Sequence, residues 1–455
     1  MGERPTLPTS RAAYPPRPAR VLLIVGAVVA ITLVTGGVVT AGRDGDRAPA
    51  AGPAPATQLA AAPLDSARSV TTARTAPSSP GELALQLQAL LGQHTVLAAD
   101  MMRGRLRNDP DLAQAANSAL GRNTDAMGKL VAGAFGSQAA GQFTPLWSNH
   151  VTALFNYARG LADGDSGVQS QAKVSITRFE NDLAGFFVAA AQGRLPRAAA
   201  VAAVTTHIEH LIGQADAYAA KDWTRADQLY RQGFAHAFEL GKALASTLLP
   251  PAGATVLGTP GWRLRSALTQ LLGEHVELVV GAMRAGVTDS PDFTAAAAAV
   301  NGNTTDLAGA VDTLFGPAAA RRFQSLWADH IDLLVGYAAA VAKGDDSRRS
   351  AIGGELDAFE TQLAGFLNTA TGDRIASAAL AKALQSHDTM LRQQVDAFVA
   401  KDYATAHDVA YTTYQEMFGL ARQLADAFGL KVASRLPVGA ADTGRGGTAP
   451  VIGGR

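Results

Sequence analysis

Apolar residues recur three or four positions apart through most of residues 82–435, and this spacing predicts amphipathic α-helices. Alternating patterns that would predict strands are nearly absent. Short segments rich in Asp, Gly and Pro form the expected hairpin turns, because these residues favour helix caps. The turns are Asn108–Pro110, Asp163–Asp165, Lys221–Asp222, Asp289–Pro291, Lys343–Asp345 and Lys401–Asp402. The pattern therefore predicts an all-α fold of up-down hairpins.

The helical pattern is a tandem duplication. The segment Leu-Trp-Ser-Asn-His that ends at His150 recurs as Leu-Trp-Ala-Asp-His ending at His330, an offset of 180 residues. The offset is 181 residues at the first histidines, so the copies differ in length by one residue in the region near Pro110 and Pro291. Each copy contains three hairpins, which predicts a six-helix bundle. Copy 1 is predicted to cover residues 82–249 and copy 2 residues 262–435.

The N-terminal region predicts a membrane anchor. Residues 21–42 carry no charge, and as a helix they would reach about 33 Å, enough to cross a hydrocarbon layer of about 30 Å. Residues 1–20 contain four arginines and one acidic residue, which predicts a cytoplasmic tail and a body outside the cell. The protein would then be a single-pass signal-anchored protein of the cell membrane. The alternative is secretion after cleavage behind Ala41. Residues 43–80 are predicted to be a disordered Ala/Pro-rich linker, and residues 439–455 a disordered tail.

Composition excludes several classes of function. Lys+Arg and Asp+Glu balance at 39 each, so the chain has no basic excess for binding nucleic acid. Cysteine is absent, which removes disulfides, thiolate metal sites and thiol nucleophiles. The chain contains no phosphate-binding loop, no Gly-x-Ser-x-Gly segment and no His-Glu-x-x-His segment. The sequence therefore favours a protein that is not an enzyme.

Six histidines stand out because each lies on the apolar face of the first helix of a hairpin. His150, for example, has Leu146 and Leu154 four residues away on either side. A second polar residue follows equally far beyond each turn, so both members of a pair should lie at one height. The pairs are His94 with Asn123, His150 with Glu180, His207 with His236, His275 with Asn303, His330 with Glu360 and His387 with Glu416. The three pairs of each copy are predicted to meet at one level inside the bundle.

Two interpretations of these polar layers remain open. In the first, histidine pairs with Glu or Asn by hydrogen bonds that fix helix register, and the body is a membrane-tethered extracytoplasmic module that binds a protein partner. In the second, the body binds or stores metal, with one site per copy for Zn, Fe, Mn or Cu(II). The candidate ligands are His94, His150, Glu180, His207, His236, His275, His330, Glu360, His387 and Glu416. The Glu-x-x-His segment of di-iron bundles is missing, which counts against a ferritin-like oxidase centre.

Three residues near turns complete the expectations. Asp111 and Asp292 are predicted to lie in the first turns of helices, where the helix dipole favours negative charge. His407 follows the last hairpin turn and is predicted to face solvent.

The body resembles a group of uncharacterised exported all-helical bacterial proteins with recurring helix-borne histidines. The matching residues are His94, Gly164-Asp165, His207 and His236, and copy 2 departs from the pattern at Glu416. The resemblance implies an all-helical fold and export, and it implies no particular activity.

Overall fold

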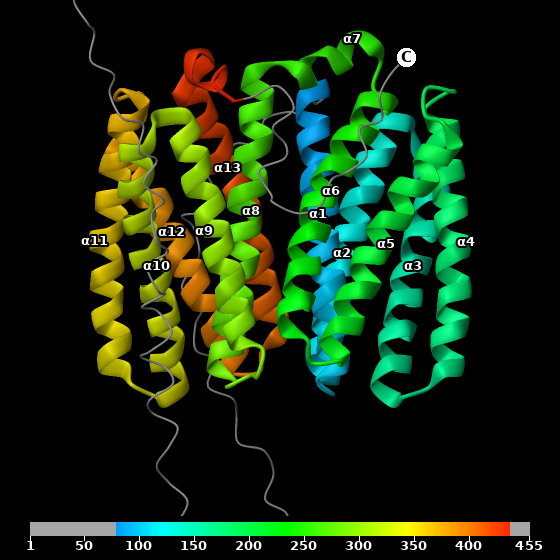
Figure 1. Cartoon of the computed structure of the whole chain (residues 1–455), viewed down its shortest axis with the longest axis horizontal. Coiled ribbons are helices and arrows are strands. Elements are labelled where there is room, and N and C mark those ends of the chain that lie inside the picture. Colours follow the sequence, from blue (N-terminus) through cyan, green and yellow to red (C-terminus); the bar gives the residue numbers. More distant parts are fainter. Residues whose placement is uncertain (1–78, 437–455) are drawn as a thin grey trace, which may run out of the picture. The chain divides into compact units, whose positions relative to one another are not determined.

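The computed structural model describes residues 79–436, and the regular structure in this range is helical (Figure 1). The helices of copy 1 are α1 (Pro80–Leu106), α2 (Pro110–Phe135), α3 (Ser137–Asp163), α4 (Ser166–Ala190), α5 (Arg197–Ala219) and α6 (Trp223–Leu248). The helices of copy 2 are α8 (Pro260–Val287), α9 (Phe293–Phe315), α10 (Pro317–Lys343), α11 (Asp346–Thr371), α12 (Ser377–Val399) and α13 (Tyr403–Ala433). The short helices α7 (Pro251–Ala254) and η2 (Thr255–Gly258) connect the copies. The all-α prediction is confirmed for the described residues.

The predicted turns form for the expected local reasons. Most of the second helices of the hairpins carry an aspartate at the N-cap, whose carboxylate accepts a hydrogen bond from a backbone N–H of the first turn. These residues are Asp109, Asp165, Asp222, Asp345 and Asp402. Gly164 and Gly344 end α3 and α10 with φ of 67° and 65°, which a glycine adopts without steric cost.

The start of α9 differs from the prediction. Asp111 lies in the first turn of α2 as expected, but α9 begins only at Phe293, after Asp292. The Asp292 carboxylate makes no cap hydrogen bond and instead accepts from Arg107 Nη2 at 2.7 Å and from the Tyr218 hydroxyl at 2.9 Å. The expectation for Asp292 was wrong because two donors of copy 1 bind its carboxylate more strongly than a helix N-terminus attracts it.

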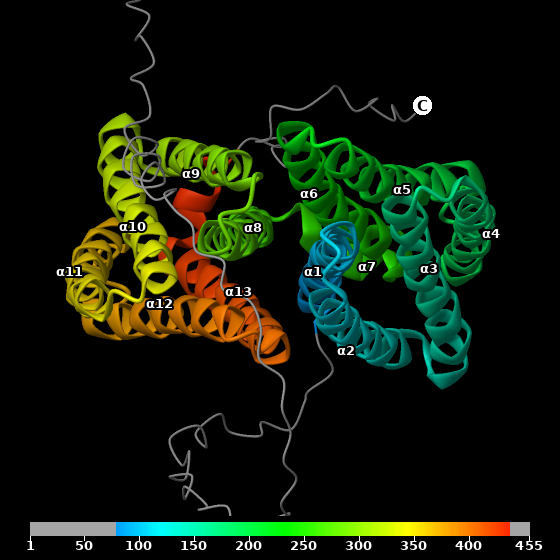
Figure 2. The ribbon, with the colours of Figure 1, turned by 90° about the horizontal axis from the view of Figure 1, so that it is seen from below.

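The first helix of each copy is the central one. α1 packs against α2, α3, α5 and α6, and α8 packs against α9, α10, α12 and α13. Figure 2 shows α1 and α8 facing each other in the middle of the helical body. Their middle turns are buried all round, including the continuous runs Leu91–Ala99 and Leu271–Val280. A helix with neighbours on every side buries polar residues together with apolar ones, and this is where His94 and His275 lie.

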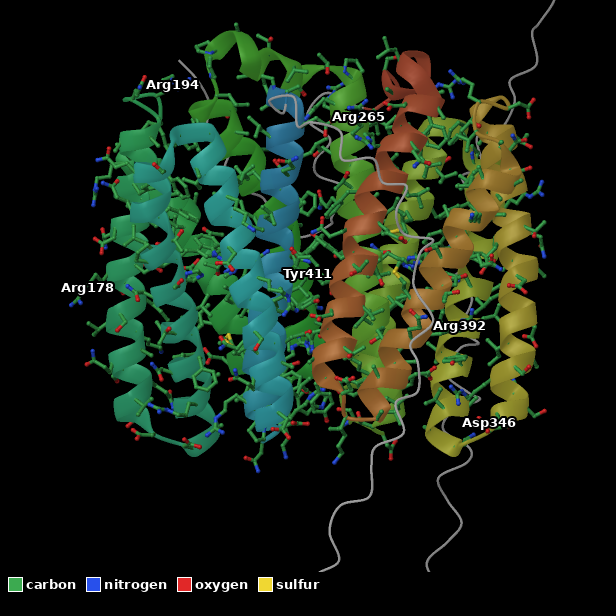
Figure 3. All side chains as sticks on the ribbon, turned by 180° about the vertical axis from the view of Figure 1, so that it is seen from behind. Arg178, Arg194, Arg265, Asp346, Arg392 and Tyr411 are labelled. Atoms are coloured by element: carbon green, nitrogen blue, oxygen red, sulfur yellow. The ribbon has the colours of Figure 1, made fainter. Side chains whose placement is uncertain are left out.

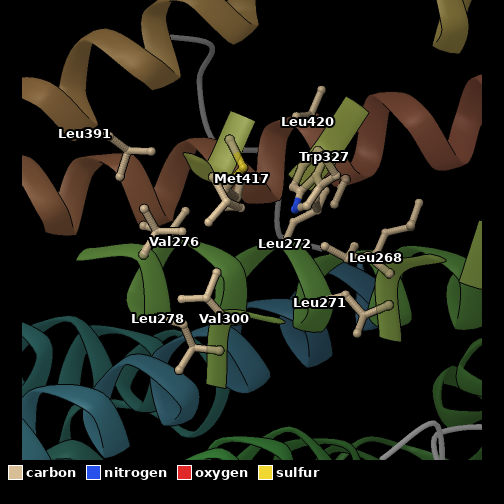
Figure 4. Packing of buried hydrophobic residues seen from close by; sticks show 14 of the residues in the cluster. Leu268, Leu271, Leu272, Val276, Leu278, Val300, Trp327, Leu391, Met417 and Leu420 are labelled. Carbon is tan, nitrogen blue, oxygen red and sulfur yellow. The ribbon is translucent and has the colours of Figure 1, made fainter. Parts of the chain in front are cut away.

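The two copies share a core. The larger apolar cluster contains the side chains of α8–α13, such as Leu272, Val276 and Met417 in Figure 4, and it also contains Phe234 and Phe238 of copy 1. A second cluster fills the middle of copy 1. Residues 79–436 accordingly belong to one compact unit.

Polar contacts also join the copies. Arg231 of α6 binds Glu274 of α8 at 2.9 Å and Asp306 of α9 at 2.8 Å. The Tyr414 hydroxyl donates to the Ala89 carbonyl at 3.0 Å. On the outer helices, by contrast, charged side chains such as Arg178 point away from the body (Figure 3).

His407 is buried, with 2% of its surface exposed, so the prediction that it faces solvent was wrong. Its side chain lies against two other helices, since Arg284 Nη1 of α8 is 3.5 Å from His407 Nε2 and Asp100 belongs to α1. His407 Nδ1 lies 2.8 Å from the Tyr403 carbonyl, and Nε2 lies 3.7 Å from Asp100 of copy 1.

The predicted membrane anchor falls in a part of the chain that the structure does not describe. Among the helices of residues 79–436, none combines the length and the apolar character needed to cross a bilayer. The predicted span 21–42, the tails and nearly all of the linker lie outside the described residues. The anchor therefore stays a prediction from the sequence.

Candidate metal sites

The first helices of the three hairpins bring three histidines together in each copy. In copy 1, α1, α3 and α5 place one ring nitrogen each of His94, His150 and His207 within 4.8 Å of one another. In copy 2, α8, α10 and α12 do the same with His275, His330 and His387. We call these groups triad 1 and triad 2. The equal distances of the histidines from their turns predicted this common level, and three parallel helices packed side by side provide it.

The asparagines of the predicted pairs do not reach the triads. Asn123 Nδ2 donates to the Leu90 carbonyl at 3.1 Å and to Gln93 Oε1 at 3.2 Å. Asn303 occupies the equivalent place and donates to the Leu271 carbonyl and to Glu274 Oε2 at 2.9 Å. The partner of each asparagine is therefore the residue before the histidine, which points to a different side of the central helix.

Three other predicted ligands are not fully buried and do not belong to the triads. Glu180 is half-buried beside Thr205, and exposed Glu416 accepts from the Ser386 hydroxyl at 3.3 Å. His236 is half-buried, and its Nε2 lies 3.0 Å from the Ala203 carbonyl. These residues are on α4, α6 and α13, the second helices of their hairpins, whereas the triads are on first helices. Height along a hairpin can be counted in the sequence, but the side of the helix that faces the centre depends on how the hairpins pack.

Glu360 is the predicted carboxylate that is buried close to a triad. It is 3% exposed and interacts with Asp388, which sequence analysis missed. Asp388 is 1% exposed, and its Oδ1 lies 3.6 Å from His330 Nδ1. A signal for Asp388 was present in the sequence, because Leu384 and Leu391 flank it at helical spacing and place it on the buried face.

All six triad histidines are at most 3% exposed. Burial lowers the pKa of His150 to about 3 and that of His387 to about 4. Burial, followed by the charges of neighbouring histidines, lowers the pKa of His94, His207, His275 and His330 well below the usual value. The six imidazoles are therefore neutral near pH 7, which is the form that binds metal.

Most triad nitrogens have no hydrogen-bond partner among the described residues. His94 Nε2 and His150 Nε2 lie 2.9 Å apart. Neither ring nitrogen of His207 or His275 has a partner within residues 79–436, and the same is true of Nδ1 of His387. A buried imidazole without a partner is costly, so such groups usually indicate a bound ion or water.

Aromatic rings hold the triad histidines in place, and the arrangement repeats. Phe179 stacks on His150 with centroids 4.2 Å apart, and Phe359 stacks on His330 at 4.5 Å. The Trp147 ring lies 4.6 Å from that of His94, and Trp327 lies 4.7 Å from His275. These contacts restrict ring rotation, so the nitrogens are oriented before anything binds.

The donor set defines the chemistry that each site could support. Three neutral imidazoles without a thiolate suit Zn²⁺ or Cu²⁺ better than Cu⁺, and Zn²⁺ would take a fourth ligand to complete a tetrahedron. The small separation of the ring nitrogens is compatible with one ion of Zn–N distance about 2.0–2.1 Å after a small movement of the rings.

Comparison with known proteins gives no relative from which a function could be carried over. No family model, no curated protein and no solved structure matches the chain.

Proposed function

We propose that this protein binds divalent transition metal, with one ion in each triad and zinc as the reference metal. The observation that carries the proposal is the meeting of three fully buried, neutral histidines in each copy with most of their nitrogens unpartnered. Storage or buffering of the metal fits these sites better than catalysis, because a large substrate could not reach histidines that are enclosed by helices.

The rival interpretation gives the triads a structural role only. It requires the buried polar groups to be paired within the protein, as the amide nitrogens of Asn123 and Asn303 are. The triads differ in degree from this neighbouring layer: each asparagine has a bonded nitrogen and an unpartnered carbonyl oxygen, whereas neither ring nitrogen of His207 or His275 has a partner among the described residues. The asparagine layer thus supports a role in helix register, and the histidine layer supports a role in binding.

Location is part of the proposal. The uncharged residues 21–42 and the arginines before them support a single-pass protein whose helical body lies outside the cell. There the body would meet metal ions that enter or leave the cell envelope. Protease accessibility of the body in intact cells tests this placement.

Metal analysis of the full-length chain, purified without a chelating tag and supplied with zinc, tests the function. We expect about two zinc ions per chain, one for each triad. The double variant His207→Ala/His387→Ala should lose both. His236→Ala, which removes a histidine outside the triads, should keep both and serves as the matched control. Less than about a tenth of an ion per wild-type chain, after supply of zinc, copper, iron and manganese in turn, would reject the proposal.

A further inference from the structure

The two triads differ at the residue that follows their third histidine. In copy 1 this residue is Ile208, which belongs to the apolar cluster of that copy. In copy 2 it is Asp388, also fully buried. The aromatic rings that pack on the histidines are alike, since each triad has an equivalent Trp and an equivalent stacked Phe. Copy 1 also places His210 and His236 near His207, where copy 2 has Met390 and Glu416. Asp388 is the difference that brings a carboxylate into contact with a triad histidine.

Asp388 approaches the edge of His330 that faces away from the centre of the triad. In copy 1 the equivalent ring, His150, turns Nε2 toward His94 at 2.9 Å. His330 has the same stacking on its Phe, with the planes 10° apart against 12° in copy 1, so we assign it the same orientation. Its Nδ1 then faces Asp388 Oδ1 at 3.6 Å, a distance that a small ring rotation shortens to a hydrogen bond.

The Asp388 carboxylate has no N–H or hydroxyl donor among the described residues. Glu360 lies beside it, and the two buried side chains interact. Arg392 is a cation that acts on both carboxyl groups, and its Nε donates to the Asp388 carbonyl at 3.4 Å. Two adjacent buried carboxyl groups are still unfavourable in a low-dielectric interior, and a dication in triad 2 would add positive charge beside them.

Outer carboxylates have a known physical effect on histidine ligands. A carboxylate that accepts the second ring N–H fixes the tautomer and orientation of the ligand and makes the ligating nitrogen more basic. It also offsets part of the charge that a divalent ion brings into a buried site. Triad 1 has Ile208 at the equivalent position, so no carboxylate there orients a ligand or offsets the charge of the ion.

We propose that Asp388 is the positioning carboxylate of triad 2: it accepts the Nδ1–H of His330, directs Nε2 to the metal, and makes the copy 2 site bind a divalent ion more tightly than the copy 1 site. This inference rests on the proposed function. The chain thus holds one strong and one weaker site on the same frame, which allows the weaker site to exchange metal while the stronger one stays filled.

Zinc titration against a competing chelator tests the inference in the full-length chain. His207→Ala leaves triad 2 as the intact site, and His387→Ala leaves triad 1. We expect the intact triad 2 to bind zinc about 10–100-fold more tightly than the intact triad 1. Adding Asp388→Asn should remove this difference, and Asp388→Glu should restore part of it.

The reverse exchange is the matched control. Ile208→Asp, placed in the chain whose intact site is triad 1, should strengthen zinc binding there. Cobalt supplies a readout that a merely structural role would not change: Asp388→Asn should alter the visible absorption of Co²⁺ in triad 2 and leave that of triad 1 as it is. Circular dichroism confirms that each variant keeps its helices.

Two results are distinguishable failures. Equal zinc affinities of the two sites, unchanged by Asp388→Asn and by Ile208→Asp, would overturn the role of Asp388 and leave the proposed function standing. The absence of metal binding at either site would overturn the proposed function itself. If Asp388→Asn does not fold, Ile208→Asp decides alone, because a copy 1 site that it fails to strengthen contradicts the proposal.

Discussion

Copy 1 and copy 2 have equivalent helices, but their cores are packed differently at the end of the bundle where α6 and α13 stop. In copy 1 a small apolar cavity of about 60 Å³ remains there, lined by side chains such as Leu87, Phe143 and Leu248. In copy 2 the equivalent of Leu248 is Phe428, which is buried in the larger apolar cluster. The chain then bends at Gly429, with φ of 74°, and returns Ala433 and Leu436 to that cluster.

The difference between the ends follows from where the chain goes next. After α6 the chain leaves for the connector, so α7 and η2 pack against Trp262, the start of α1 and the end of α6. After α13 the residues up to Leu436 cover the end of their own copy. Duplication thus preserves the helices and the triads, while the ends adapt to the connections.

The largest expected effect concerns a property that the copies share. Burial lowers the pKa of all six triad histidines below the unfolded value of about 6.5. Their contribution to stability is complete above pH 6.5 and is lost as the pH falls toward the folded pKa, which is about 4 for His387. Each histidine contributes up to about 1.4 kcal/mol per pH unit in this window, so the metal-free protein should unfold in acid.

Urea unfolding of the metal-free protein at pH 7, 6 and 5 measures this slope. His207→Gln and His387→Gln should each lower the number of protons taken up on unfolding, which sets this slope, by about one. The two decreases should be equal, because both copies bury their triads equally. A slope unaffected by either change would contradict the assignment of neutral buried imidazoles.

The ends of the copies give the next effect. Phe428→Ala should lower the free energy of unfolding by about 3–5 kcal/mol, because it opens a cavity in a filled core. Leu248→Ala should cost only about 1–2 kcal/mol, because half-buried Leu248 already borders a cavity. Chemical denaturation measures both. Equal losses would mean that the two ends are packed alike.

Asp292 and Asp111 are equivalent residues that the structure uses differently. Asp292→Ala should cost about 2–4 kcal/mol, since it leaves Arg107 and Tyr218 without their acceptor in a buried contact between the copies. Asp111→Ala should cost about 0.3–1 kcal/mol, the size of an exposed helix-dipole interaction. Thermal unfolding of the two variants under one set of conditions compares them, and a loss for Asp111→Ala as large as that for Asp292→Ala would contradict the account.

The asparagine layer gives the smallest difference. Asn123→Ala and Asn303→Ala should each cost about 1–3 kcal/mol by leaving buried acceptors unpaired. Asn303→Ala should cost slightly more, because its acceptor Glu274 is charged and also holds Arg231 of the other copy. The reverse order, measured by urea unfolding, would show that Arg231 alone satisfies Glu274.

Much of the fold could be predicted because its causes are local. Aspartate N-caps and glycines at positive φ fix the hairpin turns within a few residues of chain, so the turns follow from the residues themselves. The constant offset between the copies is enough to align His150 with His330. The common level of the three histidines followed from helix rise alone.

The partners of the histidines could not be predicted in the same way. Glu180 and Asn123 have the right height but lie on faces that the neighbouring hairpins turn away from the triads. His407 looked exposed because it follows a hairpin turn, and the packing of α13 beside Asp100 of α1 and Arg284 of α8 buries it. Asp388 is the reverse case, since its spacing indicated burial but not the approach to His330.

What the sequence determined by itself is the set of helices, their turns, the duplication and the depth of the histidines, since these depend on spacing along one chain. Only the tertiary structure decided which ring nitrogens come together and which carboxylate contacts them. It also decided which charged side chains form ion pairs between the copies. Those contacts depend on how each helix is rotated about its own axis, and that rotation is set by packing among all the helices together.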